Sequence, residues 1–251
     1  MQHHESYCLA DWPAPANIKA FTTTCIGGFS TGAFSGFNMG LYSGDDQKVV
    51  QQNRQQLMDD WGLAGKPQWL KQIHGVDVVH SRLNGQEQEA DACFSTEAGV
   101  ASAVLTADCL PVLFCNQKGT VVGAAHAGWK GMVSGVLEAT VRAMQVPATE
   151  IMAWMGPAIG PDNFEVGPEV REQFLNILPE AEQAFKPGVR DRWFGNLYLL
   201  ARLRLQKLGI TGIYGGDFCT IDQSDKFFSY RRDGKQSGRM ASVIWMESTS
   251  T

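Results

Sequence analysis

Two apolar segments joined by a short polar stretch constrain the fold of this 251-residue chain more than any other feature. Leu110–Cys115 and Thr120–Ala125 flank the segment Asn116–Gly119. Short apolar segments separated by a few polar residues that include a glycine are typical of a β-hairpin. We therefore expect an antiparallel pair of strands here.

The register of this hairpin decides which flanking side chains meet. If Gln117 and Lys118 form a two-residue loop, the pairing continues outward until Cys109 lies directly opposite His126. Opposed residues hold their Cβ atoms about 4.5–5.5 Å apart, a spacing that suits a shared metal ion. If Gly119 instead supplies the left-handed residue of a type I turn with a bulge, the register slips by one and Cys109 lies diagonal to His126. The two side chains are neighbours in both registers.

A third residue, His74, has the same kind of sequence context. His74, Cys109 and His126 each lie where an apolar, strand-like segment meets a glycine, a proline or an acidic residue. Such positions let a rigid fold present a reactive side chain to a cleft. We therefore treat these three residues as a candidate Cys/His/His site.

A structural interpretation of the same residues stays open. Free cysteines are often buried, and this chain holds six. A histidine at a strand end also often serves structure alone. The chain has five histidines, of which His3 and His4 lie near the N-terminus and His80 ends a Val-Val run as an ordinary surface residue does.

Composition excludes several classes of protein. The formal net charge is −5 and no run of basic residues occurs, which argues against a long nucleic-acid footprint. No apolar run approaches the ~18–20 residues of a membrane helix, and the N-terminus does not resemble a signal peptide. The cysteines are scattered without a disulfide framework, so we expect reduced thiols in a cytoplasmic protein. The sequence leaves the oligomeric state open.

The hydrophobic pattern predicts an α+β fold in a single domain, residues 1–251, with 1–16 as a peripheral N-terminal segment. We expect mixed β-sheets flanked by helices, with the active site at strand ends and at a helix N-terminus. The expected strands are Ile18–Thr24, Gln68–Ile73, Val76–His80, Ala90–Phe94, Val100–Thr106, the hairpin, Ile151–Met155, Gly212–Tyr214 and Ser242–Met246. The expected helices are one that opens at Asp45 and Asp46, then Lys130–Met144, Glu169–Ile177 and Leu197–Leu208, the last capped by Asn196.

Two segments offer positive charge to an anionic ligand. Gly128–Gly131 precedes a predicted helix, whose free N–H groups attract phosphate or carboxylate, and Lys130 adds charge there. Tyr230–Gly234 carries Arg231, with Arg239 beyond it, and arginine forks match the same anions. The alternatives are that the glycines only turn the chain and that the arginines form a solvated turn with a local Arg–Asp pair.

Five ordered motifs resemble those of the bacterial laccase-domain family, whose members were once called multicopper polyphenol oxidases and are now described as purine nucleoside phosphorylases. The resemblance runs from about Phe21 to Trp245. The motifs are Trp69–Gly75, Thr106–Val112, Ala125–Gly131, Gly156–Pro161 and Phe227–Asp233. The resemblance implies that His74, Cys109 and His126 bind zinc at the active site.

The chain departs from the family in the glycine-rich loop that spans Gly27–Gly40. The family often has Thr-Arg-X-Gly-Gly there, whereas this chain has Cys25 in place of the arginine. Another residue must supply the role of that arginine here, or the role is absent.

The resemblance implies phosphorolysis of adenosine, inosine and methylthioadenosine to the free base and ribose 1-phosphate, together with adenosine deaminase activity. A purine nucleoside and phosphate are then the partners. Three protein ligands leave one position of a zinc ion open, which is typical of catalytic zinc. A water acidified there would suit deamination, although the H-x-E motif of zinc deaminases is missing. Lys130 and Arg231 are the candidate phosphate ligands, and Asp108 is the nearest candidate for the general acid.

Three other functions stay open. Some relatives are described as removing misincorporated L-serine from a UDP-linked muropeptide, and a zinc hydroxide or a Cys109 thiolate could cleave that amide. A copper polyphenol oxidase needs more histidines than this chain has, although copper could occupy the site in vitro. A structural zinc needs a fourth protein ligand, for which the candidates are a carboxylate or one of Cys93, Cys115, Cys219 and His80.

Overall fold

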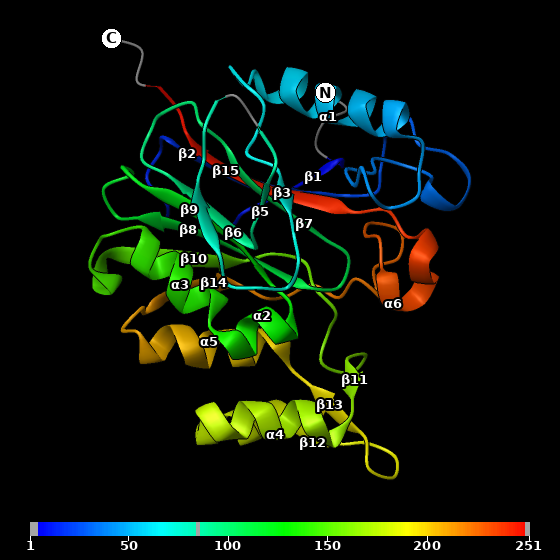
Figure 1. The fold of residues 1–251 in the computed structure, drawn as a ribbon, viewed down its shortest axis with the longest axis vertical. Helices are drawn as coiled ribbons and strands as arrows, with labels where there is room; N and C mark the ends of the chain where they lie inside the picture. The colour runs from blue at the N-terminus through cyan, green and yellow to red at the C-terminus, as the bar shows by residue number, and fades with distance from the viewer. Residues whose placement is uncertain (1–4, 84–85, 249–251) are drawn as a thin grey trace.

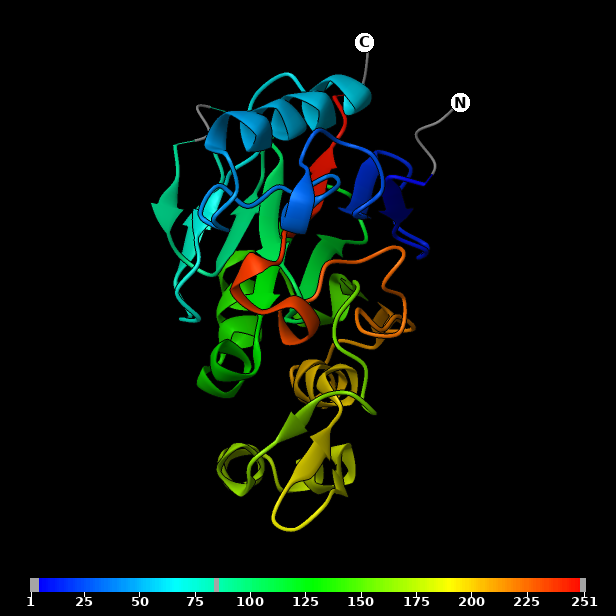
Figure 2. The same ribbon diagram turned by 90° about the vertical axis from the view of Figure 1, so that its right-hand side faces the viewer.

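Two stacked β-sheets form the centre of the computed structural model, which describes residues 5–83 and 86–248 (Figures 1 and 2). The larger sheet has the strand order β14 (Gly212–Gly215), β10 (Ile151–Met155), β8 (Leu110–Asn116), β9 (Val122–Ala127), β6 (Ala92–Ser95) and β4 (Val78–His80). The smaller has the order β1 (Tyr7–Leu9), β2 (Ile18–Thr23), β15 (Met240–Met246) and β7 (Ser102–Thr106). The larger sheet is mixed, because β14 and β4 run parallel to their neighbours and the other pairs are antiparallel.

Alternate residues of the central strands enter two different cores, as a strand buried on both faces requires. On β8, Leu113 and Cys115 face the smaller sheet in a core that includes Ile244. Val112 and Phe114, on the other face, pack in a core with the helices. This burial on both faces explains why the hairpin is apolar at nearly every position.

Helices cover both outer faces of the two sheets. α1 (Gln47–Trp61) covers the smaller sheet, where Trp61 stacks on Phe21 with ring centroids 4.6 Å apart. The larger sheet is covered by α2 (Trp129–Ser134), α3 (Val136–Ala143) and α5 (Leu197–Lys207) (Figure 1). α4 (Pro168–Ile177) lies at the far end of the long axis from α1, with the small sheet β11 (Glu165–Val166), β13 (Trp193–Gly195) and β12 (Phe185–Pro187).

The remaining elements are short. β3 (Leu70–Lys71) pairs in parallel with β5 (Gln88–Glu89), and α6 (Tyr230–Asp233) lies beside the start of β15. Short 3-10 helices occur at Gly32–Phe34, Ala148–Glu150, Pro179–Ala184 and Gly234–Gln236. Of these short elements, β3 and α6 contribute residues to the pocket described below.

The structure confirms the α+β class with mixed sheets and flanking helices. The caps were also predicted correctly, because Asp46 accepts a hydrogen bond from Lys48 N at the start of α1 and Asn196 accepts one from Leu199 N at the start of α5. The sequence pattern missed the strand β1, which pairs with β2 within the predicted N-terminal segment, as well as β5 and the small sheet around β13.

The predicted strand Gln68–Ile73 is mostly a loop, because a side chain makes the hydrogen bonds that a strand would make there. The amide of Gln72 donates to Leu105 O at 2.7 Å and accepts from Leu105 N at 2.7 Å. This side chain thus takes the place of a neighbouring strand along β7. The backbone from Gln72 onward is therefore free to turn away from the sheet toward His74.

The predicted hairpin exists, but its register is wrong by two residues. Pro111, not Cys109, lies opposite His126. The loop is longer than two residues because the Asn116 side chain accepts hydrogen bonds from the backbone of Thr120 and Val121, while Gly119 is left-handed at φ 64°. A shift of two residues keeps every side chain on its expected face.

The predicted helix Lys130–Met144 is two helices separated by Gly135. This glycine has φ 104° and ψ 29°, so it ends α2 and begins α3 with a change of direction. The apolar face predicted for one helix is retained, since Met132, Val136 and Leu137 are fully buried in one core. The break keeps α2 short and sets its first turn beside the end of β9.

No helix in the described parts of the chain is long and apolar enough to span a membrane. All six cysteines are free thiols, as the sequence predicted. Cys93 and Cys115 are fully buried between the two sheets.

We predict that Gly135→Ala destabilises the protein by about 1–2 kcal/mol. A Cβ at this position meets nothing closer than 3.5 Å, so the cost comes from the left-handed backbone and not from a clash. Denaturant unfolding measures it, with the exposed neighbour Ser134→Ala as a control that stays within ~0.5 kcal/mol of the parent. Equal stability of the two variants would contradict the strain.

Candidate metal centre and pocket

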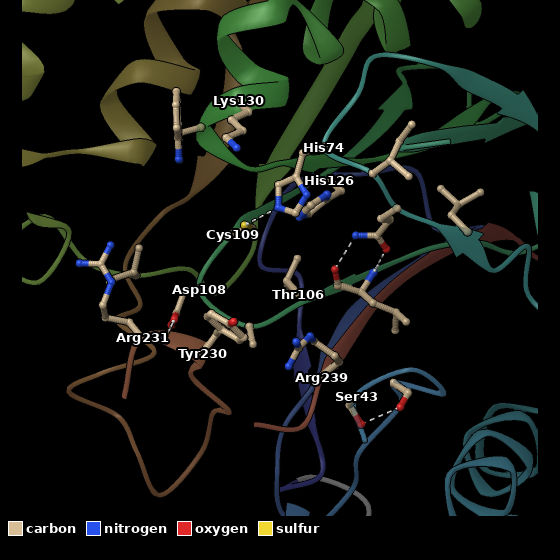
Figure 3. Close-up of a pocket in the computed structure, with 18 of the residues that line it drawn as sticks. Ser43, His74, Thr106, Asp108, Cys109, His126, Lys130, Tyr230, Arg231 and Arg239 are labelled. Atoms are coloured by element: carbon tan, nitrogen blue, oxygen red, sulfur yellow. Dashed lines mark hydrogen bonds between the residues drawn. The ribbon is translucent and has the colours of Figure 1, made fainter. Parts of the chain in front are cut away.

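A cavity of about 900 Å³ lies at one end of the sandwich. The ends of β7 and β9 and the starts of α2 and α5 border it, and loops from the two sheets complete its walls (Figure 3). This agrees with the expected position at strand ends and a helix start. Its lining includes His74, Cys109, His126, Lys130 and Arg231, so the structure brings all five predicted site residues to one pocket.

His74, Cys109 and His126, here called the trio, come together from three separate segments. Each offers one ligand atom, and these atoms all lie within 4.8 Å of one another. Cys109 Sγ is 3.9 Å from His74 Nε2, and the two imidazole rings meet edge to face with centroids 4.8 Å apart. Because the hairpin register differs from the predicted one, Cys109 reaches His126 diagonally and not as its opposed partner.

A glycine makes room for the trio. Cys109 lies in the tight turn between β7 and β8, directly after Asp108 at φ 85°. A Cβ on Gly128 would lie 3.0 Å from Cys109 Sγ and 3.1 Å from the His74 ring. Any side chain at position 128 would therefore push these two ligands apart.

The buried carboxylate of Asp91 holds both histidines. Its oxygens accept the backbone N–H groups of Ile73, His74 and Gly75 at 3.1, 2.9 and 2.6 Å. These bonds fix the left-handed backbone of His74 at φ 62°. One oxygen also lies 2.8 Å from His126 Nδ1. This bond turns Nε2 of His126 toward the pocket, the arrangement found where a carboxylate orients a metal-binding histidine.

Sequence reasoning missed Asp91. The available signal was an aspartate within the otherwise apolar segment Ala90–Phe94, where an unpaired charge would be costly. Asp91 is fully buried, and burial acts to raise the pKa of its carboxyl, but His126 and the backbone N–H groups of Gly75 and Ile73 lower that pKa below its ordinary value. The carboxylate is therefore charged at neutral pH.

Charge coupling within the trio is strong. Burial opposes ionisation of the Cys109 thiol, but His126 and His74 outweigh it and lower the pKa of Cys109 to about 6. Burial also opposes protonation of His126, but Cys109 and Asp91 raise its pKa to about 9. Between these two values the metal-free protein holds a thiolate beside an imidazolium.

The trio fits a single soft or borderline metal ion. Thiolate and imidazole are ligands that suit zinc, with bonds of ~2.0–2.3 Å, so small side-chain rotations would bring the three donors onto one ion. The other cysteine and histidine candidates are elsewhere. Cys93 and Cys115 are in the core, Cys219 lines a second cleft, and His80 lies against Phe94.

His3 and His4 lie outside the described residues. Within residues 5–83 and 86–248, the candidate metal group holds three protein donors and no fourth.

The other predicted residues have distinct surroundings. Lys130 and Arg231 are exposed at the pocket, and Arg231 Nη1 donates to Glu165 O at 3.1 Å. Asp108 does not present a free carboxyl to the pocket, because its oxygens accept hydrogen bonds from Thr220 Oγ1 and Arg231 N, both at 2.5 Å. This geometry favours a positioning role for Asp108 over that of a general acid.

Cys25, which replaces the arginine often found in the family, is outside the pocket lining. Its backbone pairs with Lys226 O and Phe37 N, and its thiol contacts Asp225 O. Burial raises the pKa of the Cys25 thiol, and the nearby guanidinium of Arg232 acts to lower it. The Arg232 guanidinium donates hydrogen bonds to the carbonyls of Thr220 and Phe227 and forms an ion pair with Asp233. This ion pair matches the alternative prediction of a turn with a local Arg–Asp pair.

Several pocket residues gave no signal in the sequence beyond their motifs. The end of the glycine-rich loop, Gly40, and the next three residues, Leu41, Tyr42 and Ser43, line the pocket. Thr106 and Tyr230 contribute from β7 and α6. Arg239, noted only as lying beyond the basic patch, is also in the wall. These positions are recognisable only once the loops are folded over the end of the sheets.

We predict that Asp91→Asn lowers the affinity for a divalent metal by about 10- to 100-fold and destabilises the fold by about 2–4 kcal/mol. The amide would turn an N–H group toward buried N–H donors and would leave His126 without its negative partner. The exposed Asp77→Asn in the same region is the matched control. Unchanged metal affinity would show that Asp91 does not orient the trio.

We predict that metal affinity rises about tenfold per pH unit between pH 6 and 9. In this range Cys109 is already a thiolate, whereas His126 must lose its proton before it binds a metal. Calorimetric titration with Zn²⁺ at pH 7.5, in two buffers of different ionisation enthalpy, should show release of about one proton. A pH-independent affinity would contradict the thiolate–imidazolium pair.

Comparison with known proteins places this architecture in a family. A family model described as multi-copper polyphenol oxidoreductase laccase matches residues 19–247. A purine nucleoside phosphorylase of Pseudomonas aeruginosa is 47% identical over 243 residues, covering 96% of this chain and 99% of that protein. The purine nucleoside phosphorylase YfiH of Escherichia coli is 48% identical over 242 residues, covering 95% and 98%.

Solved structures agree with these relatives. The crystal structure of protein NMB0706 from Neisseria meningitidis has a TM-score of 0.93 at 48% identity and covers 97% of this chain and 100% of that one. YlmD from Geobacillus stearothermophilus has a TM-score of 0.93 at 30% identity and covers 99% and 98%. Because these similarities extend over nearly all of its length, the chain belongs to the multi-copper polyphenol oxidoreductase laccase family.

Proposed function

We propose that this protein is a zinc-dependent purine nucleoside phosphorylase that acts on adenosine, inosine and methylthioadenosine and also deaminates adenosine. The observation that supports the proposal most is the trio, a candidate metal site, on the wall of a pocket of about 900 Å³. The relatives named purine nucleoside phosphorylase, at 47% and 48% identity, support the same class of reaction.

The size and lining of the pocket suit a nucleoside together with an anion. About 900 Å³ is at the upper end of the range for small-molecule sites. Aromatic side chains that can stack on a purine are Tyr42, Trp129, Phe164 and Tyr230. Lys130 and Arg231 bring positive charge to the same opening and are the proposed substrate-binding cations.

The metal would be held by His74, Cys109 and His126. When bound, zinc supplies a Lewis acid and a means of making a water more acidic at neutral pH. Asp91 orients His126 and the His74 loop, and Gly128 leaves the space that the three ligands need.

In the phosphorolysis step one bond forms and one bond breaks. A phosphate oxygen forms a bond to C1′ of the ribose, the C1′–N9 bond breaks, and the purine leaves with its bonding electrons and takes up a proton. The residues of the pocket contribute by holding the two reactants in line, which can account for a large share of a rate enhancement. Asp108 supports this geometry by tying Thr220 and the start of α6 together.

One observation makes the muropeptide amidase a second candidate function. The lowered pKa of Cys109 describes a thiolate, which is the nucleophilic form of a cysteine. The same thiolate is also what a metal ligand requires, so the observation supports both functions. A multicopper oxidase has less support, because the described residues contain a single candidate metal group with three donors.

We predict that the zinc-loaded protein converts inosine to hypoxanthine and ribose 1-phosphate only when phosphate is present. Cys109→Ala should lower this activity by more than about 100-fold, because loss of a ligand costs more than loss of a residue that only orients one. Cys8→Ala, half-buried and outside the pocket, is the matched control. Products are separated by liquid chromatography.

Further assays test the deaminase activity, the alternative amidase function and the role of the trio. Conversion of adenosine to inosine without phosphate tests the deaminase activity. A kcat/KM for the UDP-linked muropeptide that exceeds the nucleoside value by orders of magnitude would favour the amidase. Full phosphorolysis by Cys109→Ala would refute the role given to the trio.

A further inference from the structure

One pocket arginine has no acidic partner. Arg239 is half-buried, and among the described residues it forms no ion pair. Burial has the largest effect on the pKa of Arg239 and lowers it. The negative groups Cys109, Tyr230 and Asp108 act in the opposite direction and raise that pKa. Asp108 is bound to Thr220 and Arg231 instead. A guanidinium in this position retains its charge and has no carboxylate in salt-bridge contact.

The guanidinium is held by one nitrogen and leaves the other two available. Arg239 Nη1 donates to Ser237 O at 2.6 Å and to Gly238 O at 2.9 Å. Among the described residues, Nε and Nη2 have no hydrogen-bond partner. Their N–H groups lie along one edge of the planar guanidinium, the edge that binds two oxygens of a phosphate side by side. The free edge is therefore a ready-made oxyanion fork.

The position of Arg239 is fixed by its surroundings. The backbone of Arg239 bonds to the side chain of Asn38 and to Met39 N. Its aliphatic stem packs over Gly40, where a Cβ would approach Arg239 Cγ to 2.7 Å. Its guanidinium carbon lies 5.5 Å from the centre of the Tyr230 ring. In Figure 3 the guanidinium points from the wall below the trio into the pocket.

A second polar group without a partner lies on β7, the strand that pairs with β15 directly after Arg239. Thr106 pairs in register with Met240, the residue after Arg239, and lies three residues before Cys109. Thr106 is 1% exposed and contributes to the pocket wall, and its hydroxyl has no hydrogen-bond partner. A buried hydroxyl without a partner calls for a ligand or water. Because it has no bond to lose, rotation about χ1 can turn it toward the cavity.

We propose that Arg239, with Thr106 beside it, forms the subsite that binds inorganic phosphate next to the trio. The inference rests on the proposed phosphorylase function, which it deepens by assigning the second substrate to one wall. Lys130 and Arg231 are exposed, so salt screens their attraction, whereas the half-buried fork of Arg239 supplies directional bonds. Arg239 then sets the affinity for phosphate, and the aromatic residues are left for the base.

The test is direct binding of radiolabelled inorganic phosphate to the zinc-loaded protein, combined with KM values for phosphate and for inosine. Arg239→Gln should weaken phosphate binding and raise its KM by about 100-fold, while the KM for inosine stays within about threefold. Arg239→Lys should recover only part of the loss, because an ammonium lacks the fork. Thr106→Val should raise the KM for phosphate by about 3- to 10-fold, and Thr106→Ser should restore it.

Controls separate this role from a structural one. Arg142→Gln removes an exposed guanidinium outside the pocket and should change neither KM. Thr106→Val removes an unpaired buried hydroxyl, so its thermal midpoint should be equal to or higher than that of the parent. If Arg239→Gln does not fold, the partial effect of Arg239→Lys decides in its place.

Unchanged phosphate affinity in the Arg239 variants would overturn the subsite, and unchanged affinity in Thr106→Val would remove Thr106 from it. An equal rise of both KM values, or a preference for acetate over phosphate in direct binding, would also overturn it. Phosphorolysis with an Arg239-independent KM would leave the proposed function intact and refute only the subsite. Arg239-dependent phosphate binding without phosphorolysis would leave the subsite intact and refute the function.

Discussion

The carboxylate of Asp91 is the interaction on which the candidate centre depends. It is fully buried, so its charge has to be neutralised by partners within the protein. The partners are the backbone N–H groups of residues 73–75 and the ring of His126. One buried charge thereby joins the loop of His74 to the strand of His126, two candidate metal ligands. These hydrogen bonds offset the cost of burying the charge.

The stacked sheets provide the rigid frame for this arrangement. Cys109 lies in a turn at the end of β7 and His126 near the end of β9, so both are held by strands buried on two faces. Loops and short helices then close the pocket over the strand ends. Charge is distributed unevenly on its walls, with exposed cations near α2 and α6 and a half-buried arginine at the start of β15. This division would give the proposed metal, base and anion separate places.

Much of the fold followed from local pattern. The hairpin, α1, α5 and β10 were predicted within a few residues, because burial on one or both faces leaves a clear period in the sequence. The failures have local causes. A side-chain amide of Gln72 took the place of a strand, Gly135 broke a continuous helical period, and Asn116 lengthened a turn. Each is a single side chain or glycine whose effect depends on what lies across from it.

By itself, the sequence determined the α+β class, the apolar hairpin and the three residues that could bind a metal, because residue type and spacing carry that information. The proximity of Cys109 to His126 survived the error in register, since a shift of two residues keeps side chains on one face. No spacing rule connects His74 to the hairpin, so its sequence context alone made it a candidate and the family resemblance then implied its role as the third ligand. Only the tertiary structure singled out Asp91, Thr106 and Arg239. What distinguishes them is hydrogen bonds made or left unmade, and such bonds leave no period in the sequence.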